Sequence, residues 1–231
     1  DTCNLACKHC YLEDQRETNP LNFEEWKSTF YSLFGNLQPQ VVAFAGKEIF
    51  TKRDSVQVFS EALAIRDELQ KDERGTDIGI ITNGTLVHSY RQVLENPSID
   101  WVDISIDGPR EIHDEIRGRN AYSKLERNLG WLSESLQDRL WIIPTICNVN
   151  ANSLATVIEE LNSQYRIRNF SLGMYRNRPT VPDNVSVSAH DVKTFLESLE
   201  EINVSTPTNV VFGYDTYTSP KGDEFSHYIG V

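Results

Sequence analysis

The chain has 231 residues, with 22 Lys and Arg against 34 Asp and Glu, and a formal net charge of −12 at pH 7. This acidic balance disfavours a nucleic-acid partner, because no run of Lys or Arg offsets it. No apolar stretch approaches the length of a membrane span, so no membrane partner is expected either. Four cysteines are too few for a secreted scaffold held together by disulfides, which indicates reduced thiols and a cytoplasmic protein.

The first element along the chain is a loop with three cysteines, Cys3, Cys7 and Cys10, in a CxxxCxxC spacing. Three thiols this close together favour a metal centre, and three ligands leave one coordination position open. Zinc completed by His9 is an alternative, although no second Cys or His pair follows. A disulfide with one spare thiol is disfavoured. The fourth cysteine, Cys147, lies in an apolar run and is interpreted as a small buried residue at the end of a strand.

Two capping boxes and one further candidate N-cap residue predict the starts of helices. Asn22 with Glu25 precedes the first amphipathic run, and Ser188 with Asp191 precedes another. Ser153 stands before a run whose apolar spacing marks one buried helical face.

Apolar runs of strand length alternate with most of these helical segments. Strand alternating with helix predicts parallel βαβ units. The predicted strands are residues 41–44, 78–81, 101–106, 140–146, 170–172 and 210–212.

Polar residues follow the first two of these strands. Gly46 and Glu48 come after residues 41–44, and Asn83 comes after residues 78–81 in a glycine turn. Ligands bind at the carboxyl ends of parallel strands, so these residues are candidates for a binding site.

The third strand carries a more specific pattern. Ser105 and Asp107 alternate with isoleucines, so they share one face of the strand. A buried polar face needs a polar partner such as a ribose or a carboxylate. His113, Asp114 and Arg117 follow, and by themselves they indicate a surface salt-bridge cluster that opens a helix. Two later strand ends place Asn148 and Met174 at the same edge of the sheet.

The string CNLACKHCY resembles the cluster-binding loop of the radical S-adenosylmethionine (SAM) enzymes, with His9 as the aromatic-type residue before the last cysteine. The resemblance implies that Cys3, Cys7 and Cys10 hold a [4Fe–4S] cluster whose fourth iron is chelated by S-adenosylmethionine. Residues 46–49, Gly-Lys-Glu-Ile, resemble the GGEP segment that contacts the methionyl amino group. They match it at Gly46 and Glu48 only. A left-handed backbone at the second position would be strained with lysine there.

The SxDGP…HDxxR pattern resembles the peptide- and protein-modifying enzymes of the sulfatase-maturase and SPASM type. It implies that Ser105 and Arg117 meet S-adenosylmethionine. Asp107, Asn83 and Asn148 are assigned to the same cofactor site at the mouth of the barrel. No catalytic acid or base is assigned.

The implied fold is α/β, a partial (β/α)6 TIM-like barrel of parallel strands, with the family's first strand expected ahead of residue 1. Residues 1–175 are predicted to form the radical SAM core. Residues 176–231 are predicted to hold the end of the core and a C-terminal extension or the start of a further domain.

The implied reaction is reductive cleavage of S-adenosylmethionine to a 5′-deoxyadenosyl radical, which abstracts hydrogen from a peptide or protein side chain. Flavodoxin or ferredoxin is the expected reductant. The same core also suits an enzyme of small-molecule or cofactor biosynthesis. The altered glycine segment leaves open a degenerate member that binds a cluster without catalysis.

Overall fold

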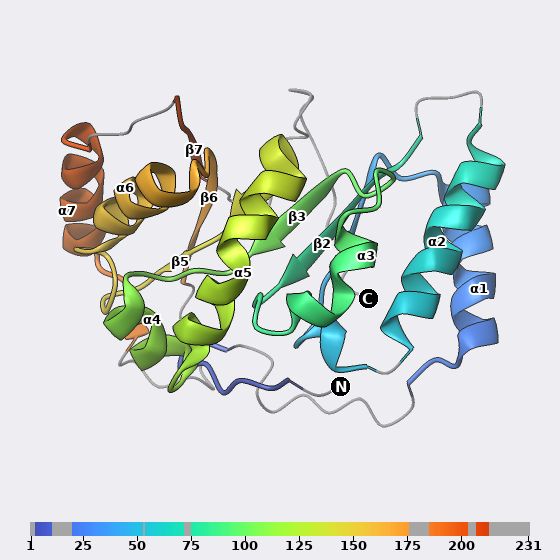
Figure 1. Cartoon of the computed structure of the whole chain (residues 1–231), viewed down its shortest axis with the longest axis horizontal. Coiled ribbons are helices and arrows are strands. Elements are labelled where there is room, and N and C mark those ends of the chain that lie inside the picture. Colours follow the sequence, from blue (N-terminus) through green and yellow to red (C-terminus); the bar gives the residue numbers. More distant parts are fainter. Residues whose placement is uncertain are drawn as a thin grey trace.

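A computed structural model of the chain describes residues 3–10, 20–52, 54–71, 75–175, 185–202 and 207–212. The described strands form one sheet in the order β1–β2–β3–β4–β6–β5, with β7 paired to β6. Every pairing is parallel. Helices connect the successive strands except β4 and β5, and they lie along the outside of the sheet (Figure 1). The predicted βαβ alternation is therefore confirmed.

The predicted strands are all present, with one correction. The run 140–146 is two strands rather than one, because Ile143 and Pro144 interrupt it and proline has no N–H for the ladder. The Pro144 carbonyl still accepts the Gly173 N–H at 3.0 Å. The strands are β1 Val41–Phe44, β2 Asp77–Thr82, β3 Trp101–Ile104, β4 Leu140–Ile142, β5 Thr145–Ile146, β6 Asn169–Met174 and β7 Asn209–Phe212.

The helices begin where the capping patterns predict. Asn22 Oδ1 accepts the Glu25 N–H at 3.1 Å while the Glu25 carboxylate accepts the Asn22 N–H at 2.8 Å. Ser188 and Asp191 form the same reciprocal pair. Ser153 precedes its helix but donates to the Asn150 carbonyl instead of capping. The helices are α1 Phe23–Tyr31, followed by a π-helical turn Ser32–Leu37, then α2 Ser55–Leu69, α3 Arg91–Leu94, α4 Arg110–Arg117, α5 Ala121–Leu136, α6 Leu154–Tyr165 and α7 Ala189–Glu200.

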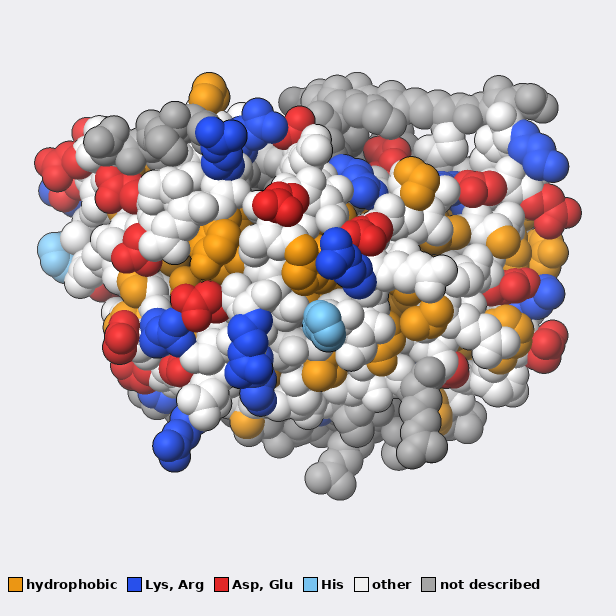
Figure 2. Space-filling model, viewed as in Figure 1, with side chains coloured by type: hydrophobic (Ala, Val, Ile, Leu, Met, Phe, Trp, Pro, Cys, Tyr) orange, Lys and Arg blue, Asp and Glu red, His pale blue; other side chains and the backbone are white. Residues whose placement is uncertain are grey.

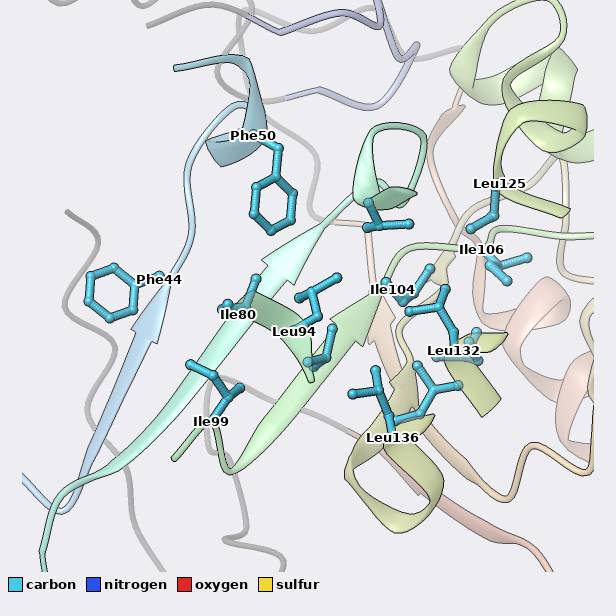
Figure 3. Close-up of a cluster of buried hydrophobic side chains, with 14 of the residues drawn as sticks. Phe44, Phe50, Ile80, Leu94, Ile99, Ile104, Ile106, Leu125, Leu132 and Leu136 are labelled. Atoms are coloured by element: carbon cyan, nitrogen blue, oxygen red, sulfur yellow. The ribbon is translucent and has the colours of Figure 1, made fainter. Parts of the chain in front are cut away.

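The main hydrophobic core fills the space between the sheet and the helices. Figure 3 shows Ile104 and Ile106 on the side of the β3 chain that faces Leu125 and Leu132 of α5, and all four belong to one buried cluster. Residues alternate along a strand, so Asp103, Ser105 and Asp107 face the opposite side. This second face is the interior of the partial barrel.

Among the described residues, no helix combines the length and apolar content that crossing a membrane requires. On the face seen in Figure 2, acidic and basic side chains are interspersed. The predicted C-terminal division rests largely on residues 176–184, 203–206 and 213–231, which lie outside the described residues. It stays a prediction.

Candidate cofactor site

The cysteine loop packs against the last turn of α4. The Lys8 N–H donates to the Ile116 carbonyl at 2.8 Å, and Lys8 Nζ pairs with Glu115 at 3.0 Å. Within the loop, the Cys10 N–H donates to the Cys7 carbonyl at 3.0 Å, which closes a tight turn. The loop is therefore held in one conformation by backbone contacts as well as by side chains.

The three thiols of this loop are half-buried, and neighbouring thiols contribute to the raised pKa values of Cys3 and Cys7. Burial raises the pKa of Cys3, and it raises the pKa of Cys7 to about 11. The Arg117 guanidinium acts in the opposite direction on both thiols, so a cation is already placed to favour their thiolate forms. Three neighbouring thiols, two of them influenced by a cation, fit a cluster that takes one thiolate on each of three irons.

The zinc alternative has less support from the geometry. Within the described part of the chain, no three His, Cys, Asp or Glu side chains converge on a position for a single metal ion. His9 Nε2 is occupied, because it donates to Asp107 Oδ2 at 2.9 Å. A cluster does not require convergence on one point, since each cysteine binds a different iron.

Asp107 joins three parts of the site. Its Oδ2 accepts from both His9 Nε2 and Arg117 Nε, and its Oδ1 accepts the Thr145 N–H at 2.8 Å. The side chain is fully buried, which by itself raises a carboxyl pKa. Arg117 and His9 outweigh that burial and hold the pKa of Asp107 well below its usual range. Asp107 is therefore an ionised anchor that links the cysteine loop, α4 and β5.

His113 contacts the backbone of Asp107 and helps to hold this anchor in place. Its Nδ1 accepts the Asp107 N–H at 3.2 Å, and its ring meets the Tyr122 ring edge-on. Burial lowers the pKa of His113 to about 4, so the ring is neutral near pH 7. The interpretation of His113 and Arg117 as surface groups is wrong, because both are buried. Asp114 instead accepts the N–H groups of Asn120 and Tyr122 at the start of α5.

Glu48 is fixed where β1 and β2 end. It accepts from the Thr82 hydroxyl at 2.8 Å, the Asn83 N–H at 2.8 Å and the Phe50 N–H at 3.2 Å. Burial raises the pKa of this carboxyl, and the three hydrogen bonds oppose that rise. Lys47 is not among the described residues with positive φ, so lysine causes no left-handed strain in the GGEP-like segment. A Cβ added to Gly46 would lie within 4 Å of one atom, in the Ile49 side chain at 3.9 Å, so the space beside this glycine is open.

The turn after β2 is bonded to the cysteine loop. Asn83 Nδ2 donates to Asn4 Oδ1 at 3.0 Å, and Asn4 Nδ2 donates to the Thr85 hydroxyl at 2.7 Å. Asn83 Nδ2 also lies 4.0 Å from Cys3 Sγ. Asn4 and Thr85 were not predicted as site residues. Asn4 follows Cys3 within the cysteine motif, and this position was the sequence signal that could have identified it as a site residue.

The structure brings most of the predicted site residues together, with Asn148 as the exception. Ser105 is buried on the interior face beside Asp107, and its N–H donates to the Thr82 carbonyl. Asn148 is exposed, and its cofactor contact stays a prediction. The buried asparagine of that turn is Asn150, whose Nδ2 donates to the carbonyls of Asp107 and Thr145.

Two further predictions concern the ends of later strands. Cys147 is fully buried, as predicted. Met174 is partly buried and packs against the main core.

The model of the Radical SAM superfamily matches residues 1–161, and the chain belongs to that superfamily. Enzymes of this superfamily use a [4Fe–4S] cluster and S-adenosylmethionine. The predicted superfamily is thereby confirmed.

Among curated proteins, the chain is 32% identical to the Fe-coproporphyrin III synthase of Methanosarcina barkeri over 55% of this chain and 30% of that protein. It is 33% identical to the subtilosin biosynthesis protein AlbA of Bacillus subtilis, over 52% of this chain and 25% of that protein. It is 27% identical to a serine-type anaerobic sulfatase-maturating enzyme of Bacteroides thetaiotaomicron, over 71% of this chain and 38% of that enzyme. The chain thus spans about a third of the length of the curated relatives it matches.

Two solved structures show the same fold. The chain superposes on anSMEcpe with bound AdoMet at a TM-score of 0.72 and 19% identity, covering 87% of this chain and 57% of that one. It superposes on Streptococcus suis SuiB bound to S-adenosylmethionine at a TM-score of 0.73 and 14% identity, covering 91% of this chain and 47% of that one. The predicted fold class, a partial TIM-like barrel, is confirmed.

Proposed function

We propose that this chain is the catalytic core of a radical SAM enzyme that modifies a peptide or protein side chain. The observation that carries the proposal is a continuous set of contacts from the cysteine loop to two charged side chains. His9 and Asp107 connect the loop to Arg117, and Asn4 and Asn83 connect it to the segment around Glu48.

Each group in this set has a chemical task that its position permits. Cys3, Cys7 and Cys10 would hold the cluster. Glu48 is an acceptor for the amino group of the methionyl moiety, because a carboxylate oxygen can take further donors beside its protein partners. Arg117 uses Nε on Asp107, so its remaining N–H donors suit a carboxylate.

Bound together, the reduced cluster and S-adenosylmethionine supply reductive cleavage to methionine and a 5′-deoxyadenosyl radical. The protein contributes position and exclusion of water. Glu48, Asp107 and Arg117 are buried and held by hydrogen bonds before any ligand arrives, so little ordering remains on binding.

A peptide or protein substrate is supported by the SxDGP…HDxxR pattern at Ser105 and Arg117 and by the names of two relatives, AlbA and the sulfatase-maturating enzyme. A small-molecule substrate is the second candidate, because heme synthases and probable GTP 3′,8-cyclases also match. Flavodoxin or ferredoxin remains the proposed reductant. A degenerate, non-catalytic role is less well supported, since Glu48 is held ready in spite of Lys47 and Ile49.

The test is formation of 5′-deoxyadenosine by the anaerobically reconstituted, dithionite-reduced protein. We expect product from the wild type and from Cys147→Ala, and none from Cys7→Ala. Cys147 is the matched control, because it is a buried thiol outside the cysteine loop. Absence of product from wild-type protein with an intact cluster would instead support the binding-only alternative.

A further inference from the structure

Asp103 is a buried acid that no part of the proposed function uses. It lies within β3 and is fully buried. The Trp101 Nε1–H donates to Asp103 Oδ2 at 3.2 Å. In the part of the chain that the structure describes, Asp103 Oδ1 has no hydrogen-bond partner. A buried polar atom without a partner is uncommon in folded proteins and calls for a physical explanation.

The position of Asp103 places it on the interior face of the barrel. Its neighbours in sequence, Val102 and Ile104, belong to the core under the helices, so Asp103 faces the other way. Trp101 lies on the same interior face, because a Cβ on Gly79 would come within 1.9 Å of its ring.

Strand register and alternation give the surroundings of Asp103. It stands between Ile81 of β2 and Trp141 of β4, which are only partly buried, so solvent-accessible surface flanks the fully buried Asp103 on this face. Ser105 is the next residue on this face toward the carboxyl end of the strand, and Asp107 follows it. Asp103 therefore lies one layer of side chains below the proposed cofactor site.

The chemistry of the group follows from its burial. Burial raises the pKa of Asp103 well above its usual range, which favours the protonated, uncharged form of the carboxyl group. In that form Oδ2 accepts the indole N–H, so the proton belongs on Oδ1. The atom without a partner is then a hydrogen-bond donor on the interior face.

We propose that Asp103 binds the substrate by donating from Oδ1 to an amide carbonyl oxygen of the molecule held in the barrel. The proposal rests on the proposed function and extends it by naming one substrate contact and the class of group that fills it. A neutral donor suits an uncharged peptide carbonyl. Leaving that donor unpaired disfavours any occupant that lacks an acceptor there.

The substrate is unidentified, so the probe is N-methylacetamide, the smallest secondary amide that resembles a peptide bond. The reporter is the Trp101 indole N–H resonance of the protein with its cluster oxidised, because that proton is bonded to Asp103. The chain has four tryptophans, and Trp101→Phe assigns the signal. Acetate, titrated in parallel, tests a carboxylate oxygen as the acceptor.

We expect a saturable shift with N-methylacetamide. Asp103→Asn keeps a donor and should bind within about threefold of wild type, whereas Asp103→Leu has a similar shape without the donor and should bind about tenfold or more weakly. A shift that is absent in the wild type, or equal in the Leu variant, overturns the proposal. A tighter response to acetate overturns the choice of an amide carbonyl.

If Asp103→Leu loses its cooperative thermal transition, a wild-type crystal soaked in N-methylacetamide decides the question. An amide oxygen within hydrogen-bond distance of Oδ1 supports the proposal, and an ordered water that persists there overturns it. The indole shift requires no turnover of S-adenosylmethionine. Failure of the proposed function would appear separately, as absent 5′-deoxyadenosine from the same wild-type preparation.

Discussion

The two faces of the segment formed by β3 and the three residues after it differ in what their side chains do. Val102, Ile104 and Ile106 face the helices and are buried among other apolar side chains. Asp103, Ser105 and Asp107 face the barrel interior and are also buried. Asp107 has charged hydrogen-bond partners there, whereas Oδ1 of Asp103 has no partner among the described residues. The helix-facing side stabilises the fold through apolar burial, whereas the interior side holds polar groups that would be costly without a ligand or an ion partner. Because side chains alternate along this segment, the residues that stabilise the fold and the residues available for binding lie on opposite faces.

The largest expected effect concerns the ionised anchor on the interior side. Asp107→Leu leaves Arg117 buried without its carboxylate, so we expect a loss of about 3–5 kcal/mol in the free energy of unfolding. Denaturant unfolding of the purified protein measures it. The matched control is Asp138→Leu, whose exposed pair with Arg168 should contribute no more than about 1 kcal/mol. Equal losses in the two variants would contradict the anchor role.

The second prediction compares neighbouring residues on opposite faces. Ile104→Ala should reduce the free energy of unfolding by about 2–5 kcal/mol, because Ile104 is fully buried against the helices. Ser105→Ala keeps the backbone bond to Thr82 and should lose less than about 1 kcal/mol. Ser105→Ala should instead weaken S-adenosylmethionine binding, measured by calorimetry on the protein with its cluster. A larger stability loss at Ser105 than at Ile104 would refute the separation.

The third prediction uses pH. The folded pKa of His113 is about 4, below the unfolded value of roughly 6.5, so the unfolded state binds more protons between these limits. The stabilisation is fully present above about pH 6.5 and is lost as the pH falls toward 4. The loss should reach about 3 kcal/mol over this interval. Urea midpoints measured at several pH values should show a smaller dependence in His113→Asn than in the wild type, and an unchanged dependence would be evidence against a buried neutral ring.

The smallest effect concerns close packing on the interior face. Gly79→Ala would place a Cβ 1.9 Å from the Trp101 ring, so the ring must move, at a cost of about 1–3 kcal/mol. Gly130 lies in α5 with open space where a Cβ would stand, and Gly130→Ala should stabilise the protein by about 0.5–1 kcal/mol. Thermal unfolding should show a lower transition temperature for Gly79→Ala than for the wild type and a higher one for Gly130→Ala. A neutral Gly79→Ala would mean that Trp101 does not pack tightly on β2.

Local patterns in the sequence were sufficient for several conclusions about this protein. The CxxxCxxC spacing indicated the superfamily, the two capping boxes located the starts of α1 and α7, and the alternation of strands and helices predicted a parallel sheet. These features depend on residues within a few positions of one another, so spacing alone carries the information.

Tertiary structure decided the partners of the polar residues. His9 and Asp107 are 98 residues apart in sequence and 2.9 Å apart in space, and Asn4 meets Thr85 across 81 residues. Asn148 and Asn150 have the same side chain two positions apart, and only the course of the backbone buries Asn150. Hydrogen bonds and ion pairs depend on atomic distance and direction, which are set when strands far apart in the chain align their carboxyl ends.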